Sequence, residues 1–158
     1  MTDKQDILKE LEHDFEKLKK ELQLTSTLED LSSIFGFKDS ILSEGYVSEN
    51  LSRQICSKIS ETFYNWISYM NNLILPNSGS MVNQTEAKMF NSKEDKELLW
   101  DLTQGAMKFV SKNSLDVVKK DKILQKEIID GAVEYWKNGF SIGAEKIMQK
   151  LHDSWNDK

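Results

Sequence analysis

The sequence predicts an all-α fold, a single-domain helical bundle of four to five main helices joined by short helical turns. Apolar residues recur at steps of three and four over several long segments, which is the period of an amphipathic helix. No segment shows the alternation, or the density of Val, Ile and Thr, that is typical of strands. The only proline, Pro76, lies between two of the periodic segments.

Composition indicates one folded unit. The chain has 158 residues, which is the size of about one domain. Its hydrophobic fraction is 39% and its charged fraction 30%, but four Trp, four Tyr and seven Phe provide large side chains for a core. We therefore assign residues 1–158 to a single helical domain.

Residues 1–24 are predicted to form an amphipathic N-terminal helix. On a helical projection their apolar residues share a stripe about 100° wide, and charged residues fill the opposite side. The stripe consists of Ile7, Leu8, Leu11, Phe15, Leu18 and Leu22. We expect it to pack on the rest of the bundle, although the spacing also allows a short coiled coil with a second copy.

Short helical turns are predicted between residues 27 and 45, ended by Gly36 and Gly45. The central core helix follows over residues 48–75. It is predicted to be the longest element, capped by Ser48 and ended by the proline at position 76.

The apolar stripe of residues 48–75 indicates whether this helix packs in the core or lies on a membrane. The stripe is about 120° wide and includes Phe63, Trp66 and Met70, so these side chains are expected to face a sealed interior. The opposite side is rich in Ser, Asn and Gln and has few cations, which does not fit a helix lying on a membrane. We therefore interpret the segment as core.

A short helix is predicted over residues 83–90, before the C-terminal helices of residues 92–155. Ser92 is expected to cap the first of these. Asn113 and Ser114 favour turns, so we expect them to interrupt that helix.

The next helix, over residues 122–138, is apolar around nearly half of its circumference. Such a helix must be packed from two sides. Gly139 is expected to end it, and Ser141 to cap the last helix, whose apolar face runs to Trp155.

No recognised catalytic or metal-binding pattern is present in the sequence, and we predict no cofactor. His13 and His152 lie near opposite ends of the chain, without a partner in a metal-ligand spacing. Cys56 lies on an apolar stripe, where burial raises the pKa of a thiol and makes it inert. We therefore expect no enzymatic activity.

The sequence also predicts a cytoplasmic protein. The densely charged first 20 residues lack the apolar run of a secretory signal. No stretch offers the roughly 20 apolar residues of a transmembrane helix. A single cysteine cannot form an internal disulfide, which fits a reducing compartment.

Two surfaces are candidates for binding a partner. The first is the reverse face of the helix that begins at Ser92, with Trp100, Thr103, Gln104 and Met107. Trp and Met are enriched at the centres of protein interfaces, but both residues would be core if this helix lay in the middle of the bundle.

The second surface is a basic stretch with a net charge of +4, in a chain whose net charge is −5. It is a candidate for contact with nucleic acid or another anionic partner, although charge runs are usually solvated. The stretch consists of Lys108, Lys112, Lys119, Lys120, Lys122 and Lys126. Because the chain has one arginine, sequence-specific recognition of nucleic acid is not expected.

Three functional hypotheses follow. The leading one is a small cytosolic interaction module that binds another protein or itself, without catalysis. The first alternative is an accessory nucleic-acid-binding subunit that contacts phosphates through residues 108–126. The second is a binder of apolar ligands, with a pocket around Phe63, Trp66 and Trp136.

Overall fold

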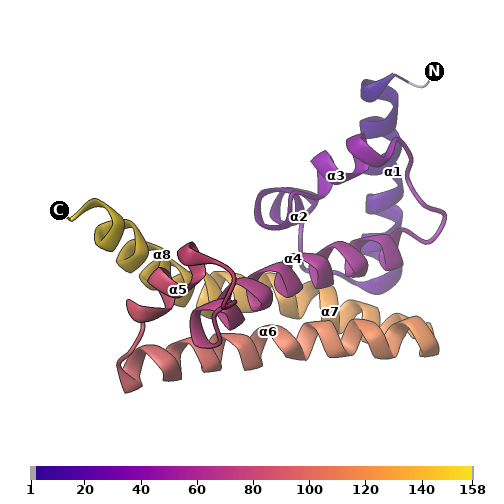
Figure 1. Ribbon diagram of the computed structural model, residues 1–158. Helices are drawn as coiled ribbons and strands as arrows, with labels where there is room; N and C mark the ends of the chain where they lie inside the picture. Colours follow the sequence, from indigo (N-terminus) through magenta and orange to yellow (C-terminus); the bar gives the residue numbers. More distant parts are fainter. Residues whose placement is uncertain (1–2, 158) are drawn as a thin grey trace.

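The computed structural model describes residues 3–157 and confirms the all-α prediction, since no strand occurs in that range. None of the helices in this range is long and apolar enough to cross a bilayer. Figure 1 shows the elements. They are α1 (Lys4–Leu22), α2 (Leu28–Phe35), α3 (Phe37–Glu44), α4 (Leu51–Ile74), α5 (Met81–Lys88), α6 (Lys93–Lys119), α7 (Lys122–Tyr135), the π-helical segment η1 (Trp136–Phe140) and α8 (Ser141–Asn156).

Helix α4 lies at the centre of the arrangement. Its most extensive contacts are with α6, and α7 packs against both. The group α1–α3 covers one half of α4, whereas α5 and the end of α8 lie at the other half (Figure 1). Helix α6 lies along the lower edge of the molecule in this view, so among residues 3–157 no helix lies against its lower long side.

The N-terminal helix packs on its own chain, as predicted. Its buried side chains lie on one face and contact α3, α4 and α7. Gly36 and Gly45 end α2 and α3 in the left-handed conformation, which confirms the two predicted stops. Helix α5 begins after Ser80, whose hydroxyl accepts the Asn83 N–H, and so starts slightly earlier than predicted.

Phe63 is the hub of the aromatic core. It is fully buried, and its ring centroid lies 5.3 Å from that of Phe109 and 5.5 Å from that of Phe140. Met70 is also fully buried, so these two predictions are confirmed. The prediction for Trp66 was only partly right, because its indole is half-buried and lines a surface hollow.

The prediction that α4 begins at Ser48 and is the longest element was wrong. The helix begins at Leu51, because the Ser48 hydroxyl accepts from the Asn50 N–H two residues on and residues 49–50 form a turn. With 24 residues α4 is shorter than α6, which has 27.

Asn113 and Ser114 do not interrupt α6, contrary to the prediction. The Ser114 hydroxyl donates to the Val110 carbonyl, one turn back, so it is satisfied inside the helix. The helix continues for a further turn and brings Asp116 to the ion pair described below.

Gly139 does not end a helix either. Residues 122–156 form one helical path, in which η1 inserts a π turn between α7 and α8. A Cβ at Gly139 would lie 3.3 Å from the Tyr135 ring, so the glycine provides room for that ring across the π turn. The predicted stop is therefore a packing position.

A buried polar junction joins α4, α6 and α7. Asp116 is fully buried and accepts hydrogen bonds from Arg53 Nη1 at 2.5 Å and from Gln125 Nε2 at 3.1 Å. Ser52 donates to Gln125 Oε1. The sequence analysis did not predict this junction, because Arg53 lies on the polar side of the α4 projection.

Candidate functional site

The predicted partner surface lies on the outer side of α6. Trp100 is 55% exposed and Met107 is 39% exposed, so the structure excludes the interpretation that both are core residues. Thr103 and Gln104 lie between them, and all four line one shallow groove of about 860 Å³. We call this depression the α6 groove. Its lining also includes Asp101, Lys108 and Tyr135.

Tyr135 reaches the α6 groove from α7 by passing over Gly105. A Cβ at Gly105 would lie 2.0 Å from the Tyr135 hydroxyl, so no other residue fits there without displacing the phenol. The Tyr135 ring stacks on Phe109, with centroids 5.7 Å apart and an interplanar angle of 24°. Tyr135 belongs to the broad apolar face that the sequence predicts for residues 122–138, and Gly105 within an apolar helical pattern was the signal of a close approach.

The Tyr135 hydroxyl is a neutral hydrogen-bonding group at the edge of the α6 groove. Burial raises its pKa, and the negative charge of Asp101 raises it further. The side chain therefore keeps its proton at neutral pH. The groove thus combines an indole, a thioether and a phenol with one carboxylate and one ammonium group.

The six predicted lysines do not form one free surface. Lys126 donates to the Gln23 carbonyl and to Asp130, which ties α7 to the end of α1. Lys122 lies 3.7 Å from Glu21 of α1. These two side chains are engaged within the protein.

Asp130 explains why Lys126 is held in place. Its carboxylate accepts from the Ser26 hydroxyl at 2.7 Å and from the backbone N–H of Thr25, in addition to Lys126. Burial acts to raise the pKa of Asp130, but the hydrogen bonds from Ser26 and Thr25 and the nearby ammonium outweigh it and lower the pKa. The charged form is thus the stable one, and it anchors the α1–α2 connection to α7.

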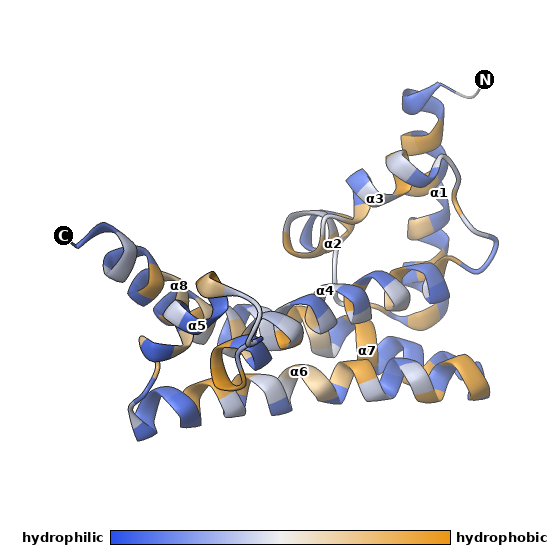
Figure 2. Ribbon diagram, viewed as in Figure 1, coloured by the Kyte–Doolittle hydropathy of each residue, from blue (hydrophilic) through white to orange (hydrophobic). Residues whose placement is uncertain are grey.

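The other four predicted lysines remain on α6 or at its end. Lys108, Lys119 and Lys120 are exposed, and Lys112 lies over the Phe109 ring at 5.8 Å. Exposed aliphatic residues separate them near the end of the helix, where Figure 2 shows apolar colouring. Binding of nucleic acid by this stretch stays a prediction.

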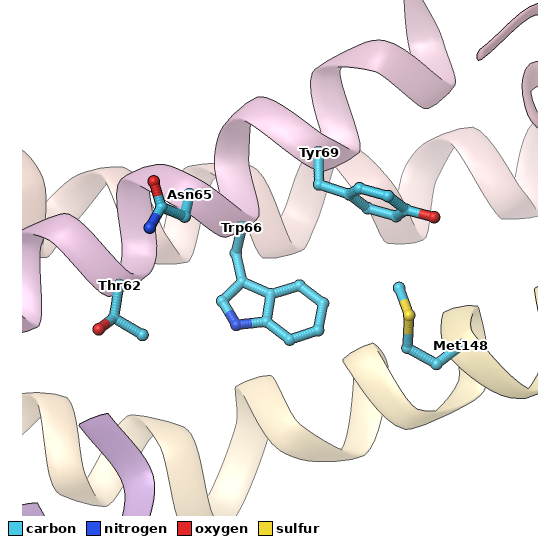
Figure 3. Close-up of a pocket in the computed structure, with 5 residues that line it drawn as sticks. All are labelled: Thr62, Asn65, Trp66, Tyr69 and Met148. Atoms are coloured by element: carbon cyan, nitrogen blue, oxygen red, sulfur yellow. The ribbon is translucent and has the colours of Figure 1, made fainter. Parts of the chain in front are cut away.

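A second hollow lies between α4 and α8 (Figure 3). The apolar-ligand hypothesis predicted a pocket around Phe63, Trp66 and Trp136, and this hollow lies next to those residues. Phe63 is sealed in the core, whereas Trp66 lines the hollow and packs on Trp136 with ring centroids 6.3 Å apart. The structure thus brings the three rings together but exposes only part of them.

Side chains with catalytic potential are dispersed. His13 and His152 are exposed on α1 and α8. Burial raises the pKa of Cys56 to about 12, so this thiol is protonated at neutral pH. Among residues 3–157 no three His, Cys, Asp or Glu side chains are grouped so as to hold a metal ion.

No protein-family model matches the chain, and neither a curated protein nor a solved structure is significantly similar to it. The fold class and the α6 groove are therefore the basis of the functional proposal.

Proposed function

We propose that the protein is a non-catalytic, self-associating module of the cytoplasm, in which the α6 helices of two copies pair antiparallel. The observation that supports this most is the unpaired side of α6. There Trp100 and Met107 are exposed on an edge helix whose flanking charges change sign along its length. A single buried thiol, Cys56, is compatible with the reducing conditions of the cytoplasm.

The charges of α6 are sorted by position. At 100° per residue, six charged side chains share a flank about 60° wide beside the α6 groove. Those of the first half are acidic, and those of the second half are basic. They are Glu94, Glu97 and Asp101, followed by Lys108, Lys112 and Lys119.

Antiparallel pairing matches these charges. The same flank of both helices meets in an antiparallel pair, so the acidic half of one copy lies along the basic half of the other. If the two-fold axis passes between Gln104 and Gly105, Asp101 faces Lys108 of the second copy. The same axis places Glu97 opposite Lys112. One register thus satisfies both pairs, and each occurs twice by symmetry.

Apolar contact supplies the remaining attraction. Trp100 and Met107 lie on either side of the proposed axis and would be covered by the second copy. Burial of aromatic and thioether side chains is a large term in protein interfaces, whereas exposed ion pairs mainly set orientation. We therefore assign affinity to Trp100 and Met107 and register to the charges.

Charge reversal tests the pairing. Lys108→Asp places its carboxylate opposite that of Asp101 at two symmetric positions. We expect the dissociation constant of the dimer to rise about 10- to 100-fold. The double variant Asp101→Lys/Lys108→Asp restores opposite charges and should recover most of the affinity. Sedimentation equilibrium over a range of protein concentrations measures these constants.

The control is Lys146→Asp, which makes the same charge change at an exposed position of α8. It should leave the dissociation constant unchanged. A wild-type protein that stays monomeric at high micromolar concentration would refute the proposal. Failure of the double variant to recover affinity would refute the antiparallel register.

A further inference from the structure

The hollow between α4 and α8 has the size of a small-molecule site. Its volume is about 440 Å³, within the range of about 300–1,000 Å³ that is usual for such sites. It is lined by Thr62, Asn65, Trp66, Tyr69 and Met148. In Figure 3 the Trp66 and Tyr69 rings project from α4 toward α8, and Met148 reaches up from α8 toward Tyr69.

The π-helical segment η1 packs against Trp66, which lines this hollow. It places Trp136 and Phe140 against Trp66, with ring centroids 6.3 Å and 5.6 Å from the Trp66 ring. The Trp136 and Phe140 rings stack on each other at 5.3 Å. Short π-helical turns are rare and occur frequently at functional sites. Here the π turn holds the Trp66 ring, which forms one wall of the hollow, in place.

The lining carries no charged side chain. Its one titratable group is the Tyr69 phenol, whose hydroxyl hydrogen-bonds to Glu86 at 3.2 Å. Burial, together with the nearby Glu86 carboxylate, raises the pKa of Tyr69 to about 12, so the phenol is neutral. An anionic ligand would lose hydration here and meet the Glu86 carboxylate instead of a cation, so the chemistry disfavours an anion and favours a neutral ligand.

Shape narrows the ligand further. The lining residues of α4 span Thr62 to Tyr69, which is about 10 Å of helix at 1.5 Å per residue. That length of about two turns, together with the volume of the hollow, matches the dimensions of a small molecule. Flat aromatic faces and a thioether favour stacking with a ring, and the exposed Asn65 amide offers a hydrogen bond at the rim.

We infer that the hollow between α4 and α8 binds a neutral, ring-bearing small molecule that stacks between Trp66, Tyr69 and Met148. The site lies on the α4–α8 side of the protein and does not include the α6 groove. Ligand binding and self-association are therefore separable.

N-phenyl-1-naphthylamine, a neutral fluorescent ring compound, is a suitable probe. Titration should give a saturable fluorescence increase at one site per chain, with energy transfer from tryptophan. Met148→Glu introduces a carboxylate into the lining and should weaken binding at least tenfold. Asn65→Trp fills the hollow from an exposed position and should weaken it as well, without altering the core.

Met107→Glu is the matched control, because it makes the same substitution in the α6 groove. It should leave probe binding unchanged while weakening self-association. Circular dichroism melts verify that each variant is folded. The inference is overturned if the wild-type protein shows no saturable binding, or if Met148→Glu and Asn65→Trp both bind the probe as tightly as the wild type.

Discussion

Replacing Phe63 with alanine should destabilise the protein by about 3–5 kcal/mol, the usual cost of truncating a buried phenylalanine. The side chain is fully buried, and its ring contacts those of Phe35, Phe109, Tyr135, Trp136 and Phe140. These rings come from α2, α6, α7 and η1, so the vacated space adjoins four elements. The midpoint of urea denaturation, converted with the measured m-value, gives the change in the free energy of unfolding.

Tyr64→Ala is the control for this prediction. Tyr64 is the next residue along α4, but it is 57% exposed, and surface substitutions usually change stability by less than about 0.5 kcal/mol. Equal losses for Phe63→Ala and Tyr64→Ala would mean that α4 does not present Phe63 to the interior.

Arg53→Met should cost a comparable amount, about 3–5 kcal/mol, because it leaves the Asp116 carboxylate buried without its cation. Asp116 would keep its hydrogen bonds from the Gln125 side chain at 3.1 Å and the Asp121 N–H at 2.9 Å. Neutral donors do not replace the interaction with a guanidinium. Urea denaturation again measures the loss.

Lys58→Met on the same helix provides the comparison. Its partner Glu61 is 60% exposed at the side chain, and the two charged atoms lie 3.5 Å apart. Pairs of this kind contribute about 0–1 kcal/mol. If Arg53→Met and Lys58→Met both lower the free energy of unfolding by the same small amount, Arg53 does not have the proposed structural role.

The fold class could be predicted from the sequence because apolar spacing is a local property. The stripes of α1 and α4 have the helical period, and burial of Phe15 and Phe63 follows from it. Continuity of helices was less predictable, since Gly139 and Asn113 are helix-breaking signals only when tertiary contacts do not override them. Phe109 and Asp116 are buried on either side of Asn113 and hold α6 together there, whereas Gly139 lies inside the π turn next to the Tyr135 ring.

The candidate site could not be predicted fully, because it depends on how the helices pack and the spacing of residues within one helix does not specify that packing. Trp100 and Met107 have the same spacing as core residues, and only the position of α6 at the edge leaves them exposed. The Arg53–Asp116 pair joins residues 63 positions apart, so no local rule connects them. Tyr135 reaches the α6 groove because α7 crosses α6 at Gly105. These features arise from helix packing rather than from helix formation.

Cysteine cross-linking at the proposed two-fold axis tests self-association through α6 most directly. Gln104 lies next to that axis, only about 1.5 Å along the helix from Gln104 of the second copy, whereas Ser111 is separated from its counterpart by about 20 Å. Cys56 is buried and does not interfere. Under mild oxidation we predict a disulfide-linked dimer for Gln104→Cys and none for Ser111→Cys. Rapid cross-linking of Ser111→Cys, or no cross-linking of Gln104→Cys, would contradict the antiparallel pairing of α6.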